Sequence, residues 1–122
     1  METSKKTLVL GASPNETRYA NIAVRRLRDA GHPVVAVGMR PGQIADVPIQ
    51  QGQPEAEDIH TITLYLNPEI QREYYDYVLG LKPKRIIFNP GTENPELQRM
   101  ARQAGIETEA ACTLVMIAAQ IY

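Results

Sequence analysis

Residues 7 to 31 combine an apolar strand, a glycine, a polar turn and an amphipathic helix, and this order limits the folds open to the chain. Leu8–Leu10 is a short apolar run, which is typical of a strand buried on both faces of a sheet. The run breaks at Gly11, and a helix is expected from Arg18 to Ala30, because its apolar residues repeat at spacings of three and four. The turn brings backbone N–H groups to the start of a helix, where anions such as phosphate groups bind. This stretch therefore predicts a site for a phosphorylated ligand.

The same alternation of strand and helix continues to the end of the chain. Further strands are expected at residues 34–37, 59–66, 85–88 and 106–109, and further helices begin after Asn67-Pro68, after Asn94-Pro95 and at Thr113. This pattern predicts an α/β fold, a Rossmann-like three-layer sandwich with a parallel five-stranded sheet in the order 3-2-1-4-5. Residues 44–49 are expected to form only a small extended excursion. In such a fold, ligands bind at the carboxyl ends of the strands, where the strand order reverses.

The composition argues against several classes of function. With 122 residues and a formal net charge of −1, the chain suits one domain over residues 1–122 and lacks the basic surplus of general nucleic-acid-binding proteins. No apolar run approaches about 18 residues, so no membrane-spanning helix is expected. The first residues carry no apolar signal-peptide core, so a cytoplasmic location is expected. The single cysteine excludes an internal disulfide and an all-cysteine metal site.

The first turn differs from that of ordinary dinucleotide-binding proteins. In the pattern G-x-G-x-x-G only Gly11 is present, and Ser13 and Glu16 occupy the other two glycine positions. Ser13 adds a hydroxyl group, and Arg18 adds a positive charge whose unfavourable interaction with the helix dipole a bound anion would offset. The alternative interpretation is that Ser13 or Asn15 caps the helix and that Arg18 is solvated.

The residues after the second strand indicate which phosphorylated ligand fits. NAD-binding proteins place an acidic residue there to hold the ribose hydroxyls, but this chain has Gly38-Met39-Arg40. An arginine suits an additional ribose phosphate, which NADP carries at the 2′ position and coenzyme A at the 3′ position. A solvated loop residue is the alternative interpretation of Arg40. No Gly-Lys-Ser/Thr sequence follows Gly11, so a P-loop and its kinase or ATPase chemistry are not expected.

Four segments together resemble one known family. They are Leu10-Gly11-Ala12-Ser13-Pro14-Asn15, the turn Ala30-Gly31-His32-Pro33-Val34, the end of the second strand, and Met100-Ala101-Arg102-Gln103-Ala104-Gly105-Ile106. In order and spacing they look like the small bacterial CoA-binding proteins, which are similar to the CoA-binding Rossmann domain of the succinyl-CoA synthetase α subunit. The resemblance extends from about residue 6 to Cys112.

The resemblance implies a CoA site made from the loops that follow four strands. The first loop would hold the pyrophosphate, the second would lie beside the adenosine 3′-phosphate, the third would flank the adenine or the pantetheine arm, and the fourth would line the thiol end. In this order, the residues are Gly11, Ala12, Ser13, Asn15 and Arg18; Gly38, Met39 and Arg40; Leu66, Asn67 and Pro68; and Asn89, Pro90 and Gly91. The chain departs from the family pattern at Met39-Arg40, Tyr19-Ala20 and Ala110-Ala111, where the family usually has Asn-Pro, Pro-Ser and Asp-Arg.

The sequence shows no constellation of residues for catalysis or metal binding. His32 lies in a turn and is expected at the surface, and His60 begins a strand at the end away from the expected site. The two histidines and Cys112 lack metal-ligand spacing, and Ser13 has no base partner for nucleophilic chemistry. Cys112 precedes the last helix, where a reactive thiol and the commoner small buried side chain are both open interpretations. The sequence thus predicts a protein that is not an enzyme.

The expected function is non-catalytic binding of coenzyme A or an acyl-CoA. An NADP-binding oxidoreductase-like domain is the first alternative, but a Tyr-x-x-x-Lys pair is absent, since Val78 and Leu79 lie four residues after Tyr74 and Tyr75. A protein-interaction module that has lost its nucleotide is the second alternative. The apolar C-terminal helix and Tyr75 are candidates for the interface of a homodimer.

Overall fold

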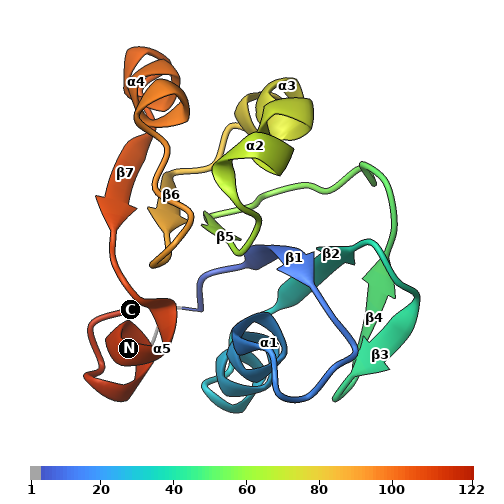
Figure 1. Ribbon diagram of the computed structural model, residues 1–122. Helices are drawn as coiled ribbons and strands as arrows, with labels where there is room; N and C mark the ends of the chain where they lie inside the picture. The colour runs from blue at the N-terminus through green and yellow to red at the C-terminus, as the bar shows by residue number, and fades with distance from the viewer. Residues whose placement is uncertain (1–3) are drawn as a thin grey trace.

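Residues 4–122 are described by the computed structural model, and they alternate between strands and helices (Figure 1). The strands of this range are β1 (Thr7–Ala12), β2 (Val34–Gly38), β3 (Gly42–Ile44), β4 (Val47–Gln50), β5 (Thr61–Leu64), β6 (Arg85–Phe88) and β7 (Glu107–Ala110). The helices are α1 (Tyr19–Asp29), α2 (Pro68–Gln71), the 3-10 helix η1 (Arg72–Tyr74), α3 (Tyr75–Gly80), α4 (Pro95–Gln103) and α5 (Thr113–Ala118). The α/β class predicted from the sequence is therefore confirmed.

One mostly parallel sheet contains all of these strands, in the order β3-β4-β2-β1-β5-β6-β7. β1 lies at its centre, where Leu8 pairs with Val35 of β2 and with Ile62 of β5. Neighbouring strands in the described chain are parallel, except that β3 and β4 form an antiparallel hairpin at one edge.

The predicted five-stranded order 3-2-1-4-5 is wrong. The third predicted strand, residues 59–66, contains β5 and pairs with β1 on the side away from β2. The reason is that β4 pairs with β2 through Ala36 and Ile49, and so occupies the outer edge of β2. The chain must then cross to the open edge of β1, which moves the reversal of strand order to the gap between β1 and β5.

The helices cover both faces of the sheet, with α1 and α5 on one face and α2, α3 and α4 on the other (Figure 1). Under α1 and α5, a buried core forms around Val9, Val24 and Met116. Under the other three helices, a second core forms around Leu10, Ile62 and Leu97. None of the helices within residues 4–122 has the length and apolarity to cross a membrane.

Two Asn-Pro pairs begin helices as the sequence predicts. Oδ1 of Asn67 accepts a hydrogen bond from the backbone N of Ile70 at 2.9 Å, and Oδ1 of Asn94 accepts one from the backbone N of Leu97 at 3.0 Å. The helix after Asn67 is broken into α2, η1 and α3, and the last helix ends at Ala118, short of its expected end at residue 122.

His32 is buried, so its expected position at the surface is wrong. Its side chain is 7% exposed, and Nδ1 accepts a hydrogen bond from the backbone N of Lys5 at 2.9 Å. The imidazole ring packs against the ring of Tyr122, with 5.0 Å between their centroids. The histidine therefore joins the two ends of the described chain at the amino ends of the strands.

Candidate functional site

Two glycines let the carboxyl ends of three strands approach one another closely. Gly11 has a φ of +104°, and a Cβ there would lie 3.0 Å from the backbone C of Tyr65. A Cβ on Gly38 would lie 2.0 Å from the carbonyl O of Ala12, which no side chain could tolerate. β1 can therefore end against the ends of β2 and β5 only with glycine at these two positions.

A pocket of about 510 Å³ opens at these carboxyl ends. Loops that follow β1, β2, β5 and β6 line it, together with the first turn of α1. The lining residues are Gly11, Ala12, Ser13, Asn15, Arg18, Tyr19, Ala20, Met39, Arg40, Tyr65, Leu66, Asn67, Pro90, Gly91 and Thr92. The pocket lies beside the reversal of strand order, where α/β folds bind their ligands.

No side chain caps the beginning of α1, which faces this pocket. Arg18 is the N-cap residue and makes no side-chain capping hydrogen bond, and the first turn contains no acidic residue. Oγ of Ser13 instead accepts from the backbone N of Asn15 at 3.1 Å, and Oδ1 of Asn15 accepts from the backbone N of Thr17 at 3.0 Å. The interpretation that Ser13 or Asn15 caps the helix is therefore wrong. The first N–H groups of α1 lack intrahelical acceptors and can donate to an anion.

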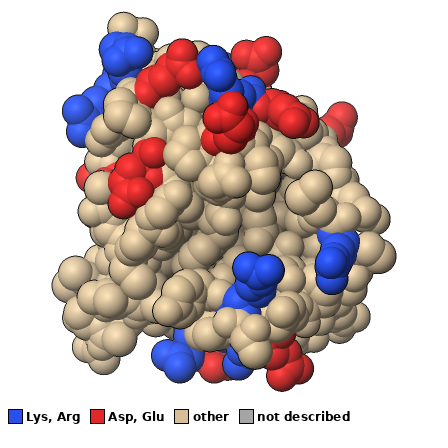
Figure 2. All heavy atoms as spheres, in the orientation of Figure 1, with Lys and Arg blue, Asp and Glu red and all other residues tan. Residues whose placement is uncertain are grey.

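Positive charge dominates the lining of the pocket. Arg18 and Arg40 are both exposed, and no Asp or Glu belongs to the lining. Glu93 lies outside the lining, where its carboxylate accepts a hydrogen bond from the backbone N of Gly91 at 2.9 Å. Figure 2 shows most of the acidic side chains of this view in its upper part, where Figure 1 draws α3 and α4. The pocket therefore favours a ligand with negative charge.

Eleven of the fourteen site residues predicted from the sequence line this pocket. The other three, Gly38, Pro68 and Asn89, lie outside the lining, and a direct contact between them and a ligand stays a prediction. Sequence reasoning did not assign four residues that do line it, which are Tyr19, Ala20, Tyr65 and Thr92. Each of these lies within two positions of a predicted residue in the sequence. Their place in the same loops is the sequence feature that could have identified them.

Asn89 is buried beneath the site, where its side-chain amide links the elements that support it. It is 2% exposed, its Nδ2 donates to Oγ1 of Thr63 at 2.7 Å and to the carbonyl O of Leu64 at 2.9 Å, and its Oδ1 accepts from the backbone N of Thr113 at 2.9 Å. These bonds tie β5 and β6 to the beginning of α5. The amide therefore has a structural role in the described chain.

The hydroxyl group of Tyr65 is buried beside the hydroxyl groups of Thr63 and Thr113, yet it makes no hydrogen bond of good geometry within the described residues. Burial raises its pKa to about 12, since the charged phenolate is poorly solvated there. Cys112, the N-cap residue of α5, is half-buried and does not belong to the lining of the pocket.

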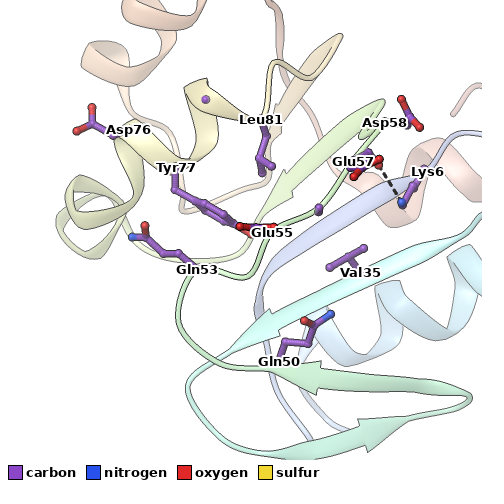
Figure 3. A pocket seen from close by; sticks show the side chains of 12 residues that line it. Lys6, Val35, Gln50, Gln53, Glu55, Glu57, Asp58, Asp76, Tyr77 and Leu81 are labelled. Atoms are coloured by element: carbon purple, nitrogen blue, oxygen red, sulfur yellow. Dashed lines mark hydrogen bonds between the residues drawn. The ribbon is translucent and has the colours of Figure 1, made fainter.

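A second, larger cavity of about 810 Å³ lies between the loop of residues 51–58, α3 and β2 (Figure 3). Four carboxylate side chains line it, those of Glu55, Glu57, Asp58 and Asp76. The ammonium group of Lys6 donates to the backbone carbonyl of Glu57 at 2.8 Å (Figure 3). This acidic lining disfavours phosphate groups, and the smaller pocket is the better candidate site. No group of His, Cys, Asp and Glu within residues 4–122 is arranged to hold a metal ion.

The chain is similar to several known proteins. A family model described as "CoA binding domain" matches residues 5–118, and no curated protein matches the chain. A crystal structure described as that of an uncharacterized protein has 46% sequence identity and a TM-score of 0.96, covering 99% of this chain and 100% of its own. A hypothetical protein from Pyrococcus horikoshii OT3 has 23% identity and a TM-score of 0.84, over 97% of this chain and 84% of its own. Cell-free ID.343 from Thermus thermophilus has 22% identity and a TM-score of 0.83, over 98% of this chain and 91% of its own. The last two similarities show the fold alone.

Proposed function

The chain belongs to the CoA-binding domain family, and from that premise we propose that it binds coenzyme A or an acyl-CoA without transforming it. The observation that carries the proposal is the pocket at the carboxyl ends of the strands, which combines an uncapped helix N-terminus with two arginines and no carboxylate. Coenzyme A carries a pyrophosphate and a ribose 3′-phosphate, and both need donors of this kind.

Each part of this ligand has candidate contacts among the residues of the pocket. The N–H groups at the start of α1 and the side chains of Ser13 and Arg18 would hold the pyrophosphate. Arg40 follows β2 and would bind the ribose 3′-phosphate. Leu66 and Pro90 would line the path of the pantetheine arm.

The absence of a chemical step is part of the proposal. The lining contains no His, Cys, Lys, Asp or Glu within the described chain, so the hydroxyl groups of Ser13 and Thr92 have no such side chain in the lining to activate them as nucleophiles. Tyr65 lines the pocket, but its buried hydroxyl holds its proton to a pKa of about 12 and is a poor base at neutral pH. We therefore assign the protein a role in binding and carrying the ligand.

Thermal and urea unfolding with CoA, acetyl-CoA, NADP and NAD test the proposal. A ligand at a hundred times its dissociation constant should raise the free energy of unfolding by about 2.7 kcal/mol. We expect this rise with CoA or acetyl-CoA, and the acyl-CoA recovered after incubation should be unchanged. A rise with NADP alone would support an oxidoreductase-like domain instead. No rise with any of these ligands would favour a protein-interaction module.

A further inference from the structure

Two of the most exposed apolar side chains of the protein stand at the same pocket. Within residues 4–122, the exposed large apolar residues are Tyr19 (71% exposed), Met39 (72%), Val115 (62%) and Ile121 (67%). Tyr19 and Met39 belong to the lining of the candidate site, whereas Val115 and Ile121 do not. Apolar surface gathered at the mouth of a polar pocket is typical of a place where a ligand is contacted.

Each of these apolar side chains is next to an arginine of the pocket. Tyr19 is the first residue of α1 and follows Arg18, and Met39 follows β2 and precedes Arg40. Two segments from different elements therefore each present one cation and one exposed apolar group to the same space. Side chains in a helix lean toward its N-terminus, so the ring of Tyr19 leans toward the loop that precedes α1.

We propose that Tyr19, with Met39 beside the same pocket, binds the planar base of the nucleotide end of the ligand. A nucleotide combines a flat ring with negative phosphate groups, and the two arginine–apolar pairs match both parts. Aromatic rings stack on nucleobases, and a methionine thioether packs well against ring edges. The inference rests on the proposed function and names the residues that select the adenosine end of coenzyme A. Tyr19 is thus proposed as a binding residue in addition to the residues expected to contact the phosphate groups.

Calorimetric titration of four proteins tests this inference, namely the wild type, Tyr19→Ala, Tyr19→Phe and Val115→Ala. The ligands are CoA, ADP and 4′-phosphopantetheine, of which the last has no base. We expect Tyr19→Ala to bind CoA and ADP about 10-fold more weakly or worse, because it loses the stacking surface, and Tyr19→Phe to stay within about 3-fold of the wild type. The affinity for 4′-phosphopantetheine should not change. Val115 is comparably exposed but lies on α5, outside the pocket, so Val115→Ala should bind all three ligands as the wild type does.

A spectroscopic measurement supports the same test. Stacking on an aromatic ring lowers the ultraviolet absorbance of adenine, and this change on binding should be present in the wild type and in Tyr19→Phe and absent in Tyr19→Ala. The inference is overturned if Tyr19→Ala binds CoA like the wild type, or if it loses affinity for CoA and 4′-phosphopantetheine equally. Binding of ADP but not CoA by the wild type overturns the proposed function alone. Binding of neither overturns both.

Discussion

At the scale of single residues, Arg40 gives the most direct test of how the ribose 3′-phosphate of a ligand would be recognised. It is exposed and makes no salt bridge within the described chain. If its guanidinium group binds the 3′-phosphate, Arg40→Ala should weaken CoA binding about 5- to 10-fold and leave dephospho-CoA binding unchanged. Titration calorimetry measures both, with the exposed Arg26→Ala on α1 as the matched control. Equal losses for CoA and dephospho-CoA would refute the assignment.

Tyr65 predicts an unusual response to mutation. Because its hydroxyl is buried without a good hydrogen bond, Tyr65→Phe should leave the free energy of unfolding unchanged or raise it by about 1 kcal/mol at neutral pH. Its folded-state pKa of about 12 lies above the unfolded value near 10, so the wild type should lose stability as the pH rises between them. This loss should shrink in Tyr65→Phe.

Tyr77 is the matched control for Tyr65, because its hydroxyl donates to the carbonyl O of Pro54 at 2.6 Å. Tyr77→Phe should cost about 1 kcal/mol in urea unfolding at neutral pH. A larger loss in Tyr65→Phe than in Tyr77→Phe would contradict this account.

The sequence locates the loops of the candidate site better than the side chains that reach it. Gly11, Arg18 and Arg40 could be found because the ends of predicted strands meet at one edge of a parallel sheet. Tyr19 was passed over as a departure from a family pattern, although its exposure at the pocket follows from its place in the first turn of α1. Asn89 was expected at the ligand because the family resemblance assigns it to the thiol end, but its amide turns into the core. Such directions depend on the pleat of the strand and the phase of the helix.

At the scale of elements, the two Asn-Pro helix starts should differ in their contribution to stability. Asn67 is exposed, and its side chain contributes through the cap of α2. Asn67→Ala should therefore lower the free energy of unfolding by about 1 kcal/mol. Asn94 is 7% exposed, and beyond capping α4 its Nδ2 donates to Oε1 of Gln71 and to the hydroxyl of Tyr75, both at 2.9 Å. Asn94→Ala should therefore cost about 2 kcal/mol or more in urea unfolding. Similar losses for both alanine variants would contradict the role of the amide.

Local patterns predicted most elements but could not predict how they pair. The sequence predicted an excursion at residues 44–49. It did not predict that β4 pairs with the edge of β2 and that β3 pairs with β4, because no local pattern encodes this pairing. The helix after Asn67 is broken where Gln71, fully buried, donates through Nε2 to the carbonyls of Leu66 and Thr92. These two hydrogen bonds join the loops of Leu66 and Thr92, which are distant in sequence. Periodicity detects amphipathic faces, and it does not detect such long-range constraints.

At the scale of the whole molecule, stability should fall on mild acidification because of His60. Desolvation, followed by the nearby Arg85, holds the pKa of His60 below its ordinary value of 6.5. Near pH 6.5 His60 therefore binds a proton in the unfolded chain but stays neutral in the folded chain. The contribution of His60 to the free energy of unfolding is present above this pH and is lost as the pH falls through the folded-state pKa. Urea unfolding between pH 8 and 5 should show this decrease, and His60→Gln should reduce its slope. An unchanged slope in His60→Gln would assign the effect to other groups.

The edges of the sheet bear on how copies of the chain could associate. β3 is three residues long and closes one edge, and β7 closes the other with the exposed Glu107 and with Glu109, which forms an ion pair with Arg85. Short or negatively charged border strands discourage a second chain from adding its own strand. Edge-to-edge pairing of strands between copies of the chain should therefore be disfavoured. The homodimer stays a prediction, and helices or loops are the more favourable surfaces for it.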